Sequence, residues 1–218
     1  MRDMLLEGLS VPVLNASVAL WRSRDKLRAL SLLAQAGLPI PATLGPGRVS
    51  LPAHIETHLG PPPWVVKLPE GSKGEGVFLV RGVEELEALR SKLPPGFLVQ
   101  AFIQESAGVD VRVLVVGGRA LAAMRRTNSS GDFRSNLAQG GHGEAVTLTP
   151  NLEELALRAT SVLGLDVSGV DFVESASGPL IVEVNGSPGL AGIESATGLD
   201  LSAEVVTFLE RHVEGHRA

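Results

Sequence analysis

The chain has 218 residues, of which 44% are hydrophobic and 20% charged, an ordinary composition for a globular protein. Its formal net charge of −5 gives no overall attraction to nucleic acid or anionic lipid. It has no cysteine for a disulfide or a thiolate metal site, and no apolar run long enough to span a membrane. We therefore expect a cytoplasmic protein with no nucleic-acid and no membrane partner, folded as one large domain or two small lobes.

The first half of the chain predicts alternating helices and strands. The segment "SRDKLRALSLLAQAGLPIP" is typical of a helix with Ser23 as its N-cap, an apolar stripe, and Gly37 with Pro39 at its end. Residues 44–63 are rich in proline and glycine, and we expect irregular chain with one short helix there. Two strands, "WVVKL" and "GVFLV", then flank the loop "PEGSKGE". A short amphipathic helix, "GVEELEALRSKL", and a buried strand, "GFLVQAFI", follow.

The second half predicts a hairpin, a long loop and two further strands. In "DVRVLVVGGRALAAMRR", Gly117 and Gly118 indicate a hairpin turn between two strands. The polar segment "TNSSGDFRSNLAQGGHGEA" predicts a loop, and "TPNLEELALRATSVLGL" a helix capped by Thr149 with Pro150 at its first position. "GVDFVESASGPLIVEVNG" adds two strands, and "DLSAEVVTFLERH" a last helix. This order predicts an α+β fold of two lobes with a hinge near residues 101–108.

Three oxygen-bearing side chains stand among apolar neighbours in the two late strands. Alternation along "GPLIVEVNG" places Ile181, Glu183 and Asn185 on one side. If the preceding strand folds back around Ser177, Asp171 lies opposite Glu183, with Cβ atoms about 4.5–5.5 Å apart. Two carboxylates this close require a neutralising partner, and an all-oxygen set suits Mg²⁺ or Mn²⁺. The set therefore predicts metal ligands, and a solvent-facing hairpin side is the alternative.

A lysine next to a glycine-rich loop predicts a phosphate site. Lys67 ends the strand "WVVK", and Gly71, Gly74 and Gly76 allow the loop backbone to approach a ligand. The loop is neither a Walker loop nor a dinucleotide fingerprint. Two of the four lysines, Lys67 and Lys73, fall in this short segment, which favours phosphate over a plain hairpin turn.

An arginine-rich loop is the second candidate for binding phosphate or carboxylate. It contains Arg125, Arg126 and Arg134, together with Asn136 and several glycines. The forked donors of arginine match carboxylate and phosphate oxygens. A solvated basic loop is the alternative.

Six segments together resemble a known enzyme family. "SRDKLRALSLLAQAGLPIP", "VVKLPEGSKGEGV", "DVRVLVVGG", "GDFRSNLAQGG", "GVDFV" and "VEVNGSPGL" occur in the order seen in ATP-grasp carboxylate–amine ligases. From about Ser23 to His212 the chain most resembles the RimK family, which adds glutamate to the C-terminus of a ribosomal protein. It also looks like the related LysX enzymes, which join an amino acid to an acidic carrier protein.

The resemblance implies an ATP-grasp fold in which two lobes clamp Mg·ATP. It implies a remnant or linker of an N-terminal domain over residues 1–22 and an ATP-grasp domain over 23–213. The smaller lobe would span about 40–103 and the C-terminal lobe about 104–213. Family members have a longer front domain, so a fragment, a misread start, a natural reduction and a separate subunit are all left open. An unpaired remnant would expose apolar surface, which favours a homo-oligomer or a partner subunit.

The resemblance also implies roles for individual residues. The nucleotide would be bound by Lys67, Gly71, Gly74, Gly76, Gln100, Ala101, Phe102, Ile103, Asp110 and Arg134. Arg134, Asn136 and Arg112 would contact the phosphate, acyl phosphate or acidic substrate, and Asp171, Glu183 and Asn185 would hold two magnesium or manganese ions. Relatives often carry glutamate in place of Ala101, and alanine cannot accept a hydrogen bond from adenine.

The implied reaction is ATP-dependent amide formation. A substrate carboxylate would attack the γ-phosphate, and an amine would capture the resulting acyl phosphate. We expect glutamate, or a similar amino acid, to be joined to a protein or peptide terminus. A LysX-like ligase, a ligase for a small metabolite, and a non-catalytic ATP-binding module that needs a partner subunit are left open.

Overall fold

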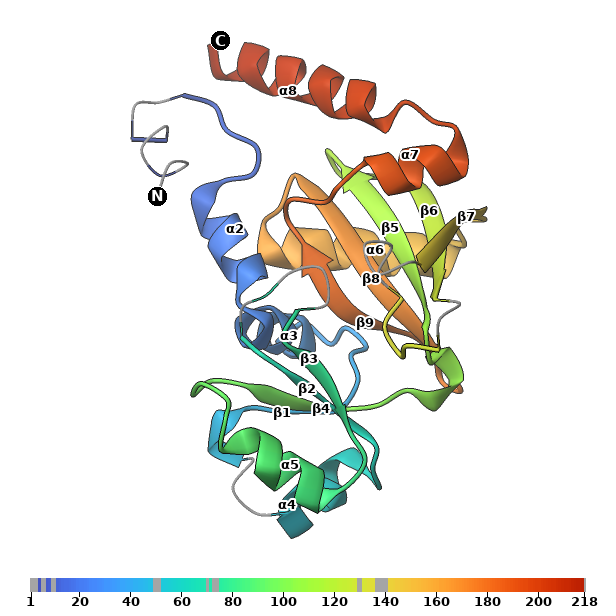
Figure 1. Cartoon of the computed structure of the whole chain (residues 1–218). Coiled ribbons are helices and arrows are strands. Elements are labelled where there is room, and N and C mark those ends of the chain that lie inside the picture. Colours follow the sequence, from blue (N-terminus) through green and yellow to red (C-terminus); the bar gives the residue numbers. More distant parts are fainter. Residues whose placement is uncertain are drawn as a thin grey trace.

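The computed structural model shows two antiparallel β-sheets with helices packed against them (Figure 1). The described residues are 4, 7–8, 11–48, 52–69, 71, 75–128, 131–135 and 141–217. Within these ranges no helix is long and apolar enough to cross a membrane.

The first sheet has four strands in the order β1-β4-β2-β3. They are β1 (Thr43–Leu44), β2 (Trp64–Lys67), β3 (Val77–Val80) and β4 (Leu98–Ala101). The 3₁₀ turn η1 (Pro46–Arg48) and the helices α4 (Pro52–Leu59) and α5 (Val83–Arg90) complete this part. Trp64 and Val66 point into a core shared with both helices, so the alternate residues Val65 and Lys67 face the other side of the sheet.

The second sheet has five strands in the order β7-β6-β5-β8-β9. They are β5 (Val109–Val116), β6 (Arg119–Asn128), β7 (Gly141–Val146), β8 (Val167–Ser175) and β9 (Gly178–Asn185). One face packs on α2 (Ser17–Arg24), α3 (Lys26–Gln35) and α6 (Pro150–Leu163). The other face packs partly on α7 (Ala191–Thr197) and α8 (Leu201–Arg217). The rest of that face, towards the first sheet, carries polar side chains. The 3₁₀ turn η2 (Gln104–Ser106) connects β4 of the first sheet to β5 of the second.

Several local predictions are confirmed. Thr149 Oγ1 accepts a hydrogen bond from the amide of Leu152 at 3.3 Å, and Pro150 begins α6. Gly117 and Gly118 have φ angles of 56° and 74° and form the turn between β5 and β6. Both angles lie in the left-handed region that glycine adopts readily.

Two local predictions are wrong. The helix expected from Ser23 is split at Asp25, whose carboxylate accepts from the amide of Arg28 at 3.0 Å and caps α3. Ser23 instead donates from its hydroxyl to the carbonyl of Leu20 at 3.0 Å and lies near the end of α2. The segment predicted as one long loop after β6 ends in a strand, β7, at the edge of the second sheet.

Replacing Thr149 with alanine should lower the free energy of unfolding by about 1 kcal/mol, because an amide of the first turn of α6 loses its cap. Thr149→Ser should retain most of the stability, because the hydroxyl remains. Urea unfolding of the three proteins measures the difference. Equal losses in both variants would mean that the methyl group, and not the cap, is responsible.

Candidate active site

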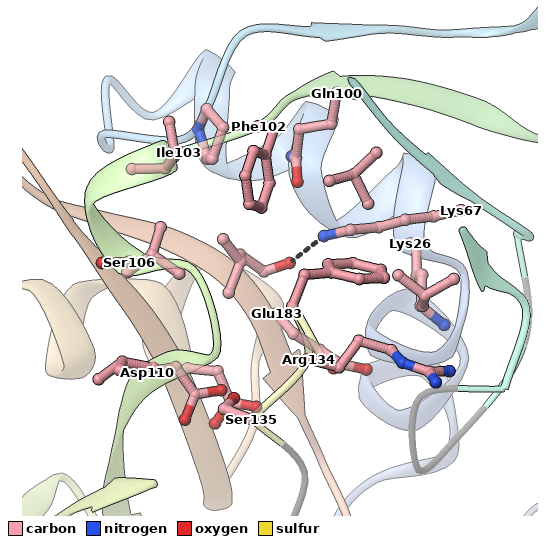
Figure 2. Close-up of a pocket in the computed structure, with 18 of the residues that line it drawn as sticks. Lys26, Lys67, Gln100, Phe102, Ile103, Ser106, Asp110, Arg134, Ser135 and Glu183 are labelled. Atoms are coloured by element: carbon pink, nitrogen blue, oxygen red, sulfur yellow. Dashed lines mark hydrogen bonds between the residues drawn. The ribbon is translucent and has the colours of Figure 1, made fainter. Parts of the chain in front are cut away.

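A pocket lies between the two sheets (Figure 2). Both sheets contribute to its wall, the first through Val65, Lys67 and Gln100 and the second through Asp110, Asp171 and Glu183. The pocket therefore brings the predicted phosphate-binding lysine and two predicted metal ligands to one place.

Asp171 lies opposite Glu183 across β8 and β9, as the sequence predicts. The prediction that Ile181 lies on the same side of β9 as Glu183 is wrong. The register shifts between these two residues, so that Phe172 pairs with Ile181. Ile181 is fully buried in the core on the α6 side and does not share a face with Glu183. The extra residue, Val182, is accommodated by a bulge, so Val182 and Glu183 both line the pocket.

Asn185, the third predicted metal ligand, is the last residue of β9 and pairs with Gly169. Its Oδ1 accepts a hydrogen bond from the amide of Ser187 at 2.9 Å. It lies two residues beyond Glu183 but is not part of the pocket wall. The structure therefore brings Asp171 and Glu183 together in the pocket and places Asn185 beside it.

Asp171 is also part of a buried network of two arginines and two aspartates in the second sheet. Arg112 donates from Nε and Nη2 to the two oxygens of Asp171, both at 2.7 Å. Arg126 donates to Asp171 Oδ2 at 2.8 Å, and with Nε to Asp110 Oδ1 at 2.6 Å. Arg126, Asp110 and Asp171 are all buried. Sequence analysis placed Arg126 in the arginine-rich loop as a candidate for binding phosphate or carboxylate, but it did not predict this pairing. The structure places Arg126 on β6, directly opposite Asp110 on β5.

The arginines determine the ionisation of Asp171. Burial alone would raise the pKa of Asp171, but the charges of Arg112 and Arg126 outweigh it and lower the pKa to about 2. At Asp110 burial has the larger effect, and its pKa is raised despite the hydrogen bond from Arg126. Asp171 is therefore ionised at neutral pH, with its charge already compensated.

Glu183 differs from Asp171 because no described arginine pairs with it, although its charge does interact with that of Lys67. Within the described part of the chain it forms no ion pair and accepts no hydrogen bond. No group of three or more histidine or acidic residues in that part is placed to hold a metal ion. The donor chemistry of Glu183, Asp171 and Asn185 nevertheless fits a hard cation that takes its remaining ligands from water or phosphate.

Lys67 connects the two sheets across the pocket. Its Nζ lies 3.5 Å from the carbonyl oxygen of Val182, a long hydrogen bond drawn as a dashed line in Figure 2. Burial lowers the pKa of Lys67 to about 8, and the nearby charge of Glu183 opposes this shift.

Lys26 is a second pocket lysine, which sequence reasoning missed. Its Nζ donates to the carbonyl of Gly71 at 2.9 Å, and its backbone amide donates to the carbonyl of Pro69 at 3.0 Å. The start of α3 is thus joined to the glycine-rich loop. The chain has only four lysines, and this scarcity was one reason to single out Lys67. The same signal could have identified Lys26.

The glycine-rich loop is closed at its base. The amide of Leu68 donates to the carbonyl of Gly76 at 2.8 Å, and a Cβ on Gly76 would lie 2.8 Å from Leu68 Cδ1. Gly71 lines the pocket, and a Cβ there would lie 2.6 Å from the carbonyl oxygen of Glu75. The predicted phosphate ligand Gly74 is outside the described residues.

The end of β4 forms the wall predicted to contact adenine. Gln100, Ala101, Phe102 and Ile103 all line the pocket. The amide Nε2 of Gln100 donates to Thr43 Oγ1 at 2.9 Å, which fixes this side chain against β1.

Arg134 stands at the pocket wall but is ion-paired. Its Nη2 donates to Asp132 Oδ2 at 2.6 Å, a hydrogen bond that raises the pKa of Arg134 and lowers that of Asp132. The neighbouring Phe133 makes an edge-to-face contact with Phe102, with ring centroids 6.2 Å apart. Asn136, predicted to act with Arg134, lies outside the described residues.

Two antiparallel sheets with a pocket between them, lined by lysines and acidic residues, are typical of the ATP-grasp fold. A D-alanine–D-alanine ligase from Bacillus anthracis has the same fold, with a TM-score of 0.79 at 19% identity over 99% of this chain and 76% of that one. The ATP-grasp ligase PsnB, in a complex with a precursor variant, Mg and ADP, gives a TM-score of 0.71 at 22% identity. That match covers 94% of this chain and 64% of PsnB, so the chain spans less than two thirds of PsnB.

The sequence comparisons identify the family. Residues 23–209 match the model of the RimK-like ATP-grasp domain. A probable alpha-L-glutamate ligase from Syntrophotalea carbinolica is 43% identical over 97% of this chain and 71% of its own length. Another from Teredinibacter turnerae is 45% identical with the same coverage. The chain therefore belongs to the RimK-like ATP-grasp family, and is an ATP-grasp carboxylate–amine ligase.

Replacing Arg126 with methionine should lower the free energy of unfolding by about 3–5 kcal/mol, because Asp110 is left buried without its partner and Asp171 loses one of two. The matched control is Arg125→Met at the next position, where the exposed guanidinium lies 3.9 Å from Glu144. That change should cost less than about 1 kcal/mol. Urea unfolding at pH 7 measures both, and similar losses would contradict the assignment of Arg126 to a buried network.

The pKa of Lys67 predicts a direction for stability against pH. Because its folded-state pKa of about 8 is below the usual 10.5, folding releases a proton between these values. Compared with Lys67→Met, the wild type should therefore become more stable as the pH rises from about 8 towards 10.5. The two proteins can be compared by urea unfolding at several pH values. A difference that is constant or declines over this window would contradict the burial of the ammonium group.

Proposed function

We propose that the protein is an ATP- and Mg²⁺-dependent ligase that joins glutamate to the terminus of a peptide or protein through an acyl phosphate. The main support for this proposal is that Lys26 and Lys67 line the same pocket as Asp171 and Glu183. Cationic groups for phosphates and oxygen ligands for a hard cation are the two requirements for binding a metal–nucleotide complex. The probable alpha-L-glutamate ligases among the relatives support glutamate as the amino acid.

The pocket residues divide naturally between the parts of the nucleotide. Lys67 and Lys26 would bind phosphate oxygens beside Gly71, which lines the pocket, whereas Gly76 closes the base of the loop outside the pocket wall. The backbone of Ala101 to Ile103 would contact adenine, since the Ala101 side chain offers no acceptor. Asp110 reaches the same wall, but both its oxygens accept from Arg126, so a contact with ribose would require one of them to be released.

We propose that Glu183, Asp171 and Asn185 hold two magnesium ions, or two manganese ions in their place. When bound, such ions neutralise charge on the phosphate oxygens. The chain's own contribution is to hold these oxygens in position. Arg112 and Arg126 keep Asp171 ionised and fix its side chain, and the bulge at Val182 places Glu183 at the pocket wall.

The proposed reaction requires no nucleophile from the protein. A substrate carboxylate attacks the γ-phosphorus of ATP and ADP leaves, which gives an acyl phosphate. An amine then attacks the acyl carbon, phosphate leaves, and an amide bond forms. Lys67, Lys26 and Arg134 would stabilise the negative charge on the transferring phosphate, and for this Arg134 would exchange Asp132 for phosphate. The enclosing sheets would keep water from the acyl phosphate.

We also propose a division of the chain that follows the two sheets. The smaller lobe would be residues 40–103 and the C-terminal lobe residues 104–213, joined near η2. The peptide or protein acceptor would meet the pocket at its open side.

ATP binding to the purified chain is the first test. Calorimetric titration should show binding that depends on Mg²⁺ and falls by at least about tenfold in Lys67→Ala, because a phosphate loses its partner charge. Lys92→Ala is the matched control, since Lys92 is exposed and outside the pocket. Equal losses in the two variants would contradict the phosphate role of Lys67.

Glu183→Gln should reduce amide formation by at least about a hundredfold, because it removes a charge that acts on the transferring phosphate through the cation. Mass spectrometry of reactions with glutamate, ATP and candidate acceptors measures the product. Glu174→Gln, a change on β8 outside the pocket, should leave the rate unchanged. Full ligation by Glu183→Gln would exclude the proposed mechanism, whereas ATP binding by the wild type without product from any acceptor would favour a non-catalytic module.

A further inference from the structure

Asn15 lies in the segment before α2, and its side-chain amide is buried and fully hydrogen-bonded. The residue is 2% exposed. Nδ2 donates to the carbonyl oxygens of Val167 and Gly186, each at 2.7 Å. Oδ1 accepts from the backbone amides of Asp166 and Val167. Both donor hydrogens and the acceptor oxygen are therefore used, which a buried amide requires if it is not to lose its hydration without compensation.

These partners stand at the open end of the hairpin formed by β8 and β9. Val167 is the first residue of β8, and Gly186 directly follows Asn185, the last residue of β9. Because the strands are antiparallel, the start of one lies beside the end of the other. Asn15 thus joins the two strands at the end where no turn connects them.

Gly186 is tightly enclosed. A Cβ on it would lie 2.8 Å from Leu165 Cδ2 and 2.9 Å from Ser23 Oγ, so the backbone fits closely between α2 and the end of the α6–β8 connection. Asn185 Oδ1 accepts from the amide of Ser187 in the same turn. A displacement of Gly186 would therefore move the side chain of Asn185 as well.

We propose that Asn15 is a positioning residue for the carboxylate and amide oxygens of β8 and β9. It acts through the Gly186 carbonyl and touches no ligand itself. The inference rests on the proposed function, because it requires Glu183 and Asn185 to hold a metal–nucleotide complex. Residues 11–16, interpreted from the sequence as part of a remnant, are then a working part of the ligase lobe.

The test compares two buried substitutions in the same lobe. Asn15→Asp keeps the shape and the acceptor but turns carboxylate oxygen towards the carbonyls of Val167 and Gly186. Ser168 is fully buried on β8, and its hydroxyl lies 2.6 Å from that of Thr160. Ser168→Ala therefore removes a buried hydrogen bond from the same strand without touching Gly186.

Each protein is titrated with ATP at a series of Mg²⁺ concentrations by calorimetry. Hydrogen exchange of residues 183–189 is followed separately by mass spectrometry without ligand. In Asn15→Asp the Mg²⁺ concentration for half-maximal ATP binding should rise by about 10- to 100-fold, the usual effect of losing a group that orients metal ligands. Exchange over 183–189 should also become faster, and neither quantity should change in Ser168→Ala.

The outcomes separate this inference from the function on which it rests. If the wild type shows Mg²⁺-dependent ATP binding and Asn15→Asp binds and exchanges like the wild type, the positioning role is excluded. If the wild type itself shows no such binding, the proposed function fails and the positioning role fails with it.

Amide hydrogen exchange of the wild type provides a second test of the role of Asn15 if Asn15→Asp does not fold. The amides of Asp166 and Val167 donate to Asn15, so they should exchange as slowly as the inner amides of β8. Exchange as fast as that of an exposed turn would overturn the inference.

Discussion

The pocket depends on the balance of charge inside the second sheet. Asp110 and Asp171 are buried, and Arg126 lies between them while Arg112 holds the other side of Asp171. Either aspartate alone would be costly to keep ionised away from water. Arginines on the neighbouring strands outweigh that cost at Asp171, whose pKa is lowered, and offset part of it at Asp110, whose pKa is raised. An ionised carboxylate can therefore stand at the wall of the pocket. Among the described residues Glu183 forms no ion pair, so its oxygens are open to the cation that we propose for this pocket.

Local sequence patterns predicted much of the fold and the facing carboxylates. Strand alternation and a turn near Ser177 were sufficient to place Asp171 opposite Glu183, because antiparallel register follows from the position of the turn. The cap at Thr149 and the turn at Gly117 and Gly118 were also visible, since each depends on residues close in sequence. The resemblance to a ligase family added the pocket residues of β4, whose role no local pattern indicates.

The remaining features depend on contacts between distant segments. The bulge at Val182 moves Ile181 into the core, and alternation alone cannot show where a strand gains a residue. Arg126 was read as part of a basic loop because its partners, Asp110 and Asp171, lie on other strands. Asn15 has partners more than 150 residues away, so nothing near it in the sequence indicates its role.

The connections between the two sheets make the first sheet an insertion into the second lobe. The helices α2 and α3 come first in the chain but pack with the second sheet, and the amide of Ile181 donates to the carbonyl of Pro39. Just after Pro39 the chain enters the first sheet, and it returns to the second sheet after Ala101. The amide of Ala101 donates to the carbonyl of Ala42 at 2.9 Å. The outgoing and returning segments therefore run side by side. The hydrogen bonds from Lys26 to the carbonyls of Pro69 and Gly71 are a further tie between the two parts, so any rotation of residues 43–101 against the second sheet has to break them.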